Sequence, residues 1–107
     1  MATDRVHVNQ AKPELEDVAE ILRRHRASLF ERFRVSRIGV FGSFARGEQT
    51  EGSDIDILVE FSEPIGWEFT DLQAFLENVL GRKVDLATVR ALKPQLRDRI
   101  LAEVADA

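Results

Sequence analysis

Apolar residues recur at helical spacing in three stretches of the chain, which begin near Pro13, Trp67 and Pro94. Residues three and four apart share one face of a helix, so each stretch predicts a helix with one apolar side. A single helix is expected from Pro13 to near Phe33, because proline fits the first helical position. Gly81 is expected to end the second helix. The apolar positions are Leu15, Val18, Ala19, Leu22, Leu29 and Phe33 in the first stretch, Trp67, Leu72, Phe75, Leu76 and Val79 in the second, and Leu96, Ile100, Leu101 and Val104 in the third.

Three apolar runs between these helices predict short strands at residues 35–41, 55–61 and 83–86. A short helical turn is expected at residues 42–48, and residues 62–66 break the chain after the second strand. The order is therefore helix, strand, short helix, strand, helix, strand, helix. This alternation predicts a small α/β (α+β) fold in which helices flank a small sheet.

Length and composition narrow the class of protein. The 107 residues suit one domain, and we expect residues 1–12 to form a flexible arm and residues 13–107 to form that domain. The net charge of −4 argues against direct nucleic-acid binding, which needs a basic surface. The absence of cysteine excludes disulfides and thiolate metal ligands. No apolar segment predicts a signal sequence or a membrane span, so a cytoplasmic protein without a membrane partner is expected.

Two aspartates at the start of the second strand carry the first chemical signal. Side chains two apart on a strand point to the same face, so Asp54 and Asp56 would lie side by side while Ile55 and Ile57 face the core. Adjacent carboxylates repel each other, and a divalent cation relieves the repulsion. Mg²⁺ usually takes one or two carboxylates together with substrate phosphates. Asp85 on the third strand either adds a third carboxylate or hydrogen-bonds the backbone.

A turn of small residues before the aspartates carries the second signal. Gly42 and Ser43 follow the first strand and begin a short helical segment, whose free backbone N–H groups favour anions. Gly42 would let the backbone approach a phosphate closely, and the Ser43 hydroxyl could donate a hydrogen bond to it. Arg46 and Gly47 would close the segment. The turn and the aspartates together predict a site for a phosphate compound and its metal ions.

The turn at Gly42 and the aspartates Asp54 and Asp56 together form the sequence pattern G-S-x-x-R-G-x-x-x-x-x-S-D-x-D-[IL]. It resembles the signature of the polymerase-β-type nucleotidyltransferase superfamily. The short chain resembles the minimal branch of this superfamily, the MNT or MntA-like antitoxins that are paired with HEPN-domain toxins. Segments 80–86 and 92–100 are also similar to this branch, so the resemblance covers roughly residues 35–100. Every position of the pattern is met, by Gly42, Ser43, Arg46, Gly47, Ser53, Asp54, Asp56 and Ile57.

The resemblance implies a polymerase-β-like fold with a mixed sheet, and Mg²⁺-dependent transfer of AMP from ATP. The implied acceptor is a tyrosine hydroxyl of a cognate HEPN toxin, so the protein would be the antitoxin of a type VII-like toxin–antitoxin pair. Two Mg²⁺ ions would activate the attacking hydroxyl and neutralise the leaving group, and Asp85 is also the candidate general base. The implied site residues are Asp54, Asp56 and Asp85 for metal binding and catalysis, and Gly42, Ser43, Arg46 and Ser53 for nucleotide binding.

Several alternatives stay open at this point. Arg46 either contacts phosphate or braces the aspartate loop through a carboxylate, and Ser53 either touches the nucleotide or caps a turn. Arg82 and Lys83 either neutralise the triphosphate or form a solvated edge. For the whole protein, the alternatives are an antitoxin that inhibits its partner by binding alone, and transfer to a small-molecule or RNA acceptor.

Two further segments lie outside the pattern. Trp67 and Phe69 open the second long helix near the expected mouth of the site, where core packing is favoured over stacking on a base. Residues 23–26 read Arg-Arg-His-Arg, which indicates a solvated helix face first and a docking face for a partner second.

Overall fold

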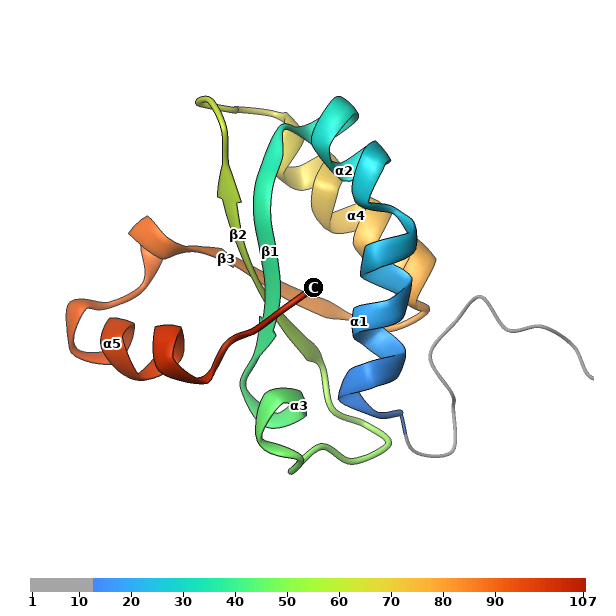
Figure 1. Ribbon diagram of the computed structural model, residues 1–107, viewed down its shortest axis with the longest axis vertical. Helices are drawn as coiled ribbons and strands as arrows, with labels where there is room; N and C mark the ends of the chain where they lie inside the picture. Colours follow the sequence, from blue (N-terminus) through green and yellow to red (C-terminus); the bar gives the residue numbers. More distant parts are fainter. Residues whose placement is uncertain (1–12) are drawn as a thin grey trace, which may run out of the picture.

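The computed structural model describes residues 13–107 of the chain, so the expected arm at residues 1–12 lies outside the described residues (Figure 1). The elements are α1 (Leu15–Arg24), α2 (Arg26–Phe33), β1 (Val35–Phe41), α3 (Ser43–Arg46), β2 (Ile55–Phe61), α4 (Glu68–Leu80), β3 (Val84–Thr88), the 3₁₀ helix η1 (Val89–Ala91), α5 (Pro94–Glu103) and β4 (Ala105–Asp106). The strands form one sheet in the order β3-β2-β1-β4. β1 runs antiparallel to β2 and β4, whereas β2 and β3 are parallel. The expected mixed sheet flanked by helices is confirmed.

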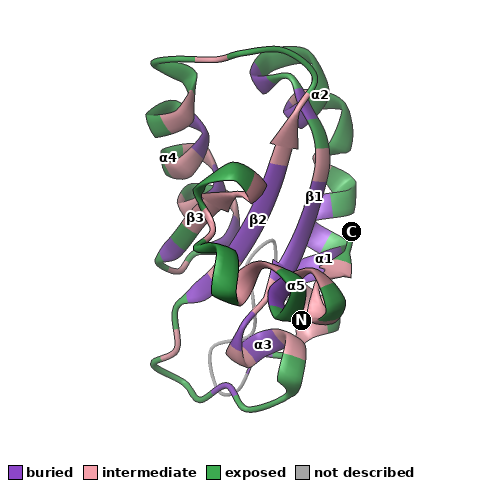
Figure 2. Cartoon of the chain, turned by 90° about the vertical axis from the view of Figure 1, so that its left-hand side faces the viewer, coloured by how far each residue is buried: buried purple, intermediate pink, exposed green. Residues whose placement is uncertain are grey.

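Helices α1, α2 and α4 cover one face of the sheet, and α5 lies on the other face (Figures 1 and 2). Ile55, Ile57 and Val59 of β2 face the three helices and are fully buried, as the alternation along the strand predicts. The intervening side chains, among them Asp56 and Leu58, therefore face the α5 side. Within residues 13–107, every helix is too short or too polar to span a lipid bilayer.

The predicted first helix is interrupted, which corrects the expectation of a single helix. His25 leaves helical geometry with φ −103° and ψ 16°, so that α1 ends at Arg24 and α2 begins at Arg26. The His25 ring compensates for the break, because its Nδ1 lies 2.9 Å from the Ile21 carbonyl oxygen and its edge meets the Phe75 ring at 5.5 Å between centroids. The apolar spacing alone could not show this break, because apolar positions on both sides of it are buried against the sheet.

The end of the chain also differs from the prediction. α5 ends at Glu103, and the next residues form the short strand β4, which pairs with Gly39 and Val40 of β1. A Cβ atom on Gly39 would lie 2.8 Å from Cγ2 of Val104, so the glycine permits this close approach. A strand of two residues carries no periodic signal, and its pairing depends on contacts that are distant in sequence.

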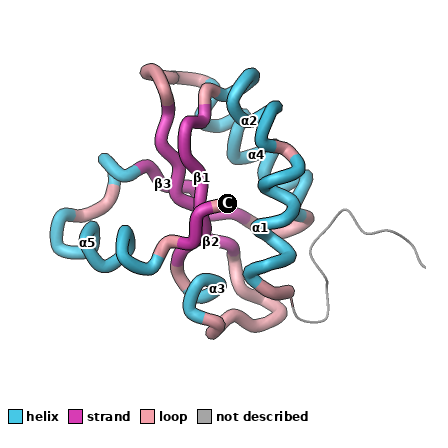
Figure 3. The backbone as a smooth tube through the Cα atoms, in the orientation of Figure 1, coloured by secondary structure: helices cyan, strands magenta, loops and turns pink. Residues whose placement is uncertain are grey.

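Trp67 was expected to pack in the core near the site, and both expectations are wrong. Its side chain is 91% exposed. Trp67 immediately precedes α4, and the loop between β2 and α4 lies at the end of the sheet where β2 finishes (Figure 3). Asp54 and Asp56 lie at the start of β2. The helix that follows is as predicted, because Gly81 ends α4 in the left-handed region with φ 70°.

Candidate active site

The first part of the candidate site is a pair of aspartates on neighbouring strands. Asp56 of β2 and Asp85 of β3 are direct partners in the parallel ladder, so their side chains leave the same face of the sheet. Asp54 comes immediately before β2. Asp56 is half-buried, and Asp54 and Asp85 are exposed. The structure therefore brings the three predicted carboxylates to one end of the face on which α5 lies.

Asp54 and Asp85 are close enough to Asp56 to change its proton affinity. The pKa of Asp56 is raised to about 6, first by partial burial, then by the charge and hydrogen bonding of the Asp85 carboxylate and by the charge of Asp54. The positive charge of Arg46 opposes this rise in the pKa. The surroundings of Asp56 thus disfavour its negative charge, and a bound cation would stabilise the charged carboxylate.

The donor set fits a divalent cation of the magnesium type. Its ligands are carboxylate oxygens, and Mg²⁺ is usually held by one or two of these while phosphates and waters complete the octahedron. No group of three or more His, Cys, Asp or Glu side chains within residues 13–107 forms a ready-made cage for a metal ion. The site therefore suits an ion that arrives with a phosphate compound.

The turn between β1 and α3 is the second part of the site. Gly42 has φ 74° and ψ −148°, which favours glycine. A Cβ atom at this position would lie 2.1 Å from Oδ2, 2.9 Å from Cγ and 3.2 Å from Cβ of Asp56. The Gly42 backbone therefore lies directly against the Asp56 carboxylate. Ser43 begins α3 and is half-buried, and its hydroxyl makes no side-chain hydrogen bond to another residue of the described range.

Arg46 lies at the end of α3 and is bound by carboxylates that were not expected. Its Nε donates to Oε1 of Glu48 at 3.0 Å, and its Nη1 lies 3.2 Å from each carboxylate oxygen of Glu103. These hydrogen bonds raise the pKa of Arg46. In this structure the Arg46 guanidinium is bound by Glu48 and Glu103 and does not brace the aspartates, and a contact of Arg46 with phosphate stays a prediction.

Ser53 closes the loop that leads to the aspartates. Its hydroxyl accepts a hydrogen bond from the Thr50 N–H at 2.8 Å, and its own N–H donates to the Thr50 carbonyl at 3.1 Å. Arg82 adds a second restraint, because its guanidinium donates to the carbonyl oxygens of Glu51 and Ser53. Ser53 thus caps a turn in this structure, and Arg82 fixes the same loop to the start of β3.

Two residues important to this geometry could not be found by sequence reasoning. Glu103 accepts a hydrogen bond from the Gly42 N–H at 2.8 Å, although it is 61 positions away in the chain. Arg82 was noted only as a possible contact to the triphosphate or a solvated residue. Neither residue is marked by a local pattern, because each acts through backbone atoms of a distant loop.

A separate cavity of about 630 Å³ lies beside α2, β1 and the end of the chain. Phe30, Val35, Ile38 and Arg37 contribute to its lining, and none of the seven predicted site residues does. The cavity contains no pair of neighbouring carboxylates comparable to Asp56 and Asp85. Its size alone does not make it the centre of the chemistry.

Comparison with known proteins agrees with the pattern of the site. The Nucleotidyltransferase domain family matches residues 22–106. A relative from Thermococcus cleftensis, named protein adenylyltransferase MntA, is 47% identical over 91 residues, which cover 84% of this chain and 92% of the relative.

Solved structures share the fold. A candidate minimal nucleotidyltransferase has a TM-score of 0.69 and 40% identity, and the match covers 86% of this chain and 94% of that one. A more distant match, with a TM-score of 0.54 and 21% identity, is a chain in the complex of a tri-AMPylated HEPN toxin of Shewanella oneidensis with an MNT antitoxin. That match covers 79% of this chain and 68% of the other.

The contact between Gly42 and Asp56 can be tested by comparing alanine substitutions at Gly42 and at Gly47, the other glycine of this turn with a positive φ. Gly42 and Gly47 both have φ 74°, but a Cβ on Gly47 would meet no atom within 4 Å. Gly47→Ala should therefore lower the free energy of unfolding only by the backbone strain, about 1–2 kcal/mol. Gly42→Ala should cost about 1–3 kcal/mol more, because the methyl group overlaps Asp56 and because ψ −148° at Gly42 is more strained for alanine than ψ 21° at Gly47. Urea denaturation measures both values, and equal losses would contradict the proposed contact.

The raised pKa of Asp56 predicts how stability depends on pH without metal. The pKa of the Asp56 carboxyl is about 6 in the folded protein, and its ordinary value is 3.8. Between pH 3.8 and pH 6 the folded protein therefore keeps a proton that the unfolded chain releases. The contribution of Asp56 to stability is therefore fully present below about pH 4 and is lost as the pH rises through about 6.

Asp56→Asn removes this titration, so we expect the variant to gain stability relative to the wild type as the pH rises from 4 to 8. Urea denaturation in EDTA at several pH values measures the difference between the two proteins. A difference that does not change with pH would contradict the raised pKa.

Proposed function

The chain belongs to the nucleotidyltransferase domain family, and from this premise we propose that it transfers AMP from ATP to a hydroxyl group of a partner protein. The observation that carries the proposal is the pairing of Asp56 with Asp85 beside the Gly42 turn. This arrangement places a carboxylate pair for a cation directly next to backbone that can approach a phosphate. We further propose that residues 13–107 form a single nucleotidyltransferase domain.

The proposed partner is a HEPN-domain toxin. The relative from Thermococcus cleftensis is named a protein adenylyltransferase, and the structural match from Shewanella oneidensis contains an AMPylated HEPN toxin together with its antitoxin. The sequence pattern resembles the same branch of antitoxins. We propose that a tyrosine hydroxyl of the toxin is the acceptor, and that its AMPylation silences the toxin.

The proposed roles follow from the positions of the side chains. Asp54, Asp56 and Asp85 would hold two Mg²⁺ ions, which would supply charge neutralisation for the triphosphate and a lower pKa for the attacking hydroxyl. The Gly42 and Ser43 turn would hold the phosphates.

In the transfer, the acceptor oxygen forms a bond to the α-phosphorus of ATP, and the bond to the bridging oxygen breaks, so that pyrophosphate leaves. The proton of the acceptor hydroxyl passes to the Asp85 carboxylate, which is exposed and therefore accessible to a protein substrate. The protein supplies position and charge compensation, as is general for phosphoryl transfer. Arg46 and Ser53 would shape the nucleotide site through the hydrogen bonds described above.

Intact-mass spectrometry of the candidate toxin tests the proposal. The toxin is incubated with this chain, ATP and Mg²⁺, and the variant Asp54→Asn/Asp56→Asn runs as the matched control. We expect mass increments of one or more adenylates on the toxin with the wild type and none with the variant. Size-exclusion chromatography of the variant with the toxin shows whether the complex still forms.

Three other results would each contradict part of the proposal. If the variant neutralises the toxin as well as the wild type does, inhibition occurs by binding alone. If ATP is consumed while the toxin keeps its mass, the acceptor is a small molecule or an RNA. If neither the toxin nor ATP changes in a well-folded complex, the chain is not an adenylyltransferase under these conditions and the proposed activity fails.

A further inference from the structure

We propose that Glu103 is a positioning residue for the Gly42 turn. Its carboxylate, at the end of α5, holds both the backbone of Gly42 and the side chain of Arg46, and so fixes the turn against Asp56. The inference rests on the proposed nucleotide transfer, because it assigns to Glu103 the task of placing the triphosphate for that reaction.

The carboxylate of Glu103 holds two parts of the same segment. Oε2 accepts the hydrogen bond from the Gly42 N–H at 2.8 Å, at the first residue of the turn. Both oxygens lie 3.2 Å from Nη1 of Arg46, at the last residue of α3. One side chain therefore connects the beginning and the end of α3, and restrains the position and the tilt of this short helix together.

Burial makes Glu103 the stronger of the two carboxylate partners of Arg46. Its side chain is 18% exposed, whereas that of Glu48 is 63% exposed. Ion pairs in full contact with water contribute little, and hydrogen bonds to a charged acceptor gain strength when water is excluded. We therefore expect the loss of Glu103 to disturb α3 more than the loss of Glu48.

The position of Gly42 explains why such a restraint matters. The residue lies between two carboxylates, since its N–H points to Glu103 and its Cα lies against Asp56. Its conformation is one that glycine leaves easily, because glycine has many alternatives of similar energy. A shift of about 1 Å in a group that positions a substrate can cost about a hundredfold in rate.

The attachment of α5 supports the same role. Among the residues of this helix, Ile100 is the one that is buried, and the others are half-exposed or exposed. Helix α5 is therefore held mainly by Ile100, by Glu103 and by β4, which follows it. The hydrogen bonds of Glu103 to Gly42 and Arg46 therefore help to hold this lightly packed helix and the turn together.

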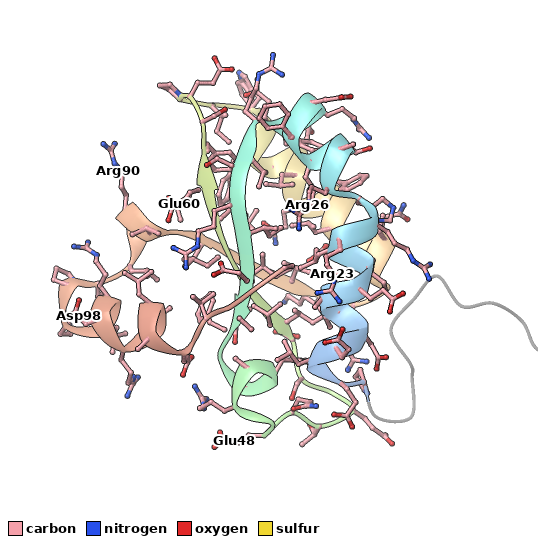
Figure 4. The ribbon with its side chains drawn as sticks, in the orientation of Figure 1. Arg23, Arg26, Glu48, Glu60, Arg90 and Asp98 are labelled. Carbon is pink, nitrogen blue, oxygen red and sulfur yellow. The ribbon has the colours of Figure 1, made fainter. Side chains whose placement is uncertain are left out.

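The test compares Glu103→Ala and Glu103→Gln with two controls. Asp98→Asn removes a carboxylate from the exposed side of the same helix, and Glu48→Gln removes the charge of the other carboxylate partner of Arg46 without touching Gly42 (Figure 4). The measured quantities are kcat and KM for ATP in the toxin assay, corrected for the folded fraction, and the hydrogen exchange rate of the Gly42 amide by NMR.

We expect Glu103→Ala to lower kcat about tenfold or more while KM changes much less, because the turn is displaced but its phosphate-binding groups remain. Glu103→Gln, which keeps an acceptor oxygen for Gly42 but loses the charge opposite Arg46, should have an intermediate effect. The Gly42 amide should exchange about tenfold faster in Glu103→Ala. Asp98→Asn should match the wild type, and Glu48→Gln should stay within about threefold of it.

Any of three results would overturn the proposal. If Glu103→Ala keeps the wild-type kcat per folded molecule, Glu103 only stabilises the fold. If the variant binds Mg²⁺ and a non-hydrolysable ATP analogue more tightly than the wild type, the carboxylate competes with phosphate for the Gly42 N–H. If the wild type itself transfers no AMP, the proposed function fails. The exchange rate of the Gly42 amide still tests the role of Glu103, because an unchanged rate in Glu103→Ala would show that Glu103 does not hold the turn.

Discussion

The contact between the Gly42 backbone and the Asp56 carboxylate is the constraint on which the site depends. A Cβ atom at position 42 would lie 2.1 Å from Oδ2 of Asp56, so any residue other than glycine would force the Asp56 carboxylate to move. The antiparallel pairing of Phe41 with Asp56 sets this approach, and the parallel pairing of Asp56 with Asp85 adds the second carboxylate. A turn suited to phosphate and a carboxylate pair suited to a cation are thus one structural unit. Partial burial and the neighbouring carboxylates disfavour an ionised Asp56, and a bound cation would favour it.

The mixed sheet provides the position for this unit. Three helices cover one face and bury the alternate residues of β2, which leaves the opposite face for polar chemistry. On that face Asp56 and Asp85 are joined by Glu103 of α5, which contacts the turn. The loop before Asp54 is held from another direction by Arg82. The functional end of the sheet is therefore restrained by side chains from elements that follow it in the chain, while the aspartates stay accessible.

Sequence periodicity was sufficient for the parts of the fold that are regular. The bounds of β1 and β2, the end of α4 at Gly81 and the inward direction of Ile55 and Ile57 were all predicted correctly. Other features depend on contacts between distant residues, which periodicity cannot report: the break at His25, the short strand β4, and the carboxylate partners of Arg46. The exposure of Trp67 was missed for a related reason, because an apolar residue at the start of a helix can face either the core or the solvent. The roles of the seven predicted site residues stay predictions, although the structure gathers them at one end of the sheet.

The most direct test of the central claim is an amide NMR titration with Mg²⁺ and a non-hydrolysable ATP analogue. The account predicts that the largest shifts occur at Gly42, Ser43, Asp56 and Asp85, because the triphosphate and its cation would bind between the turn and the carboxylate pair. Shifts centred on Phe30, Val35 and Ile38, with Gly42 unchanged, would place the nucleotide in the cavity beside α2 and would contradict the account.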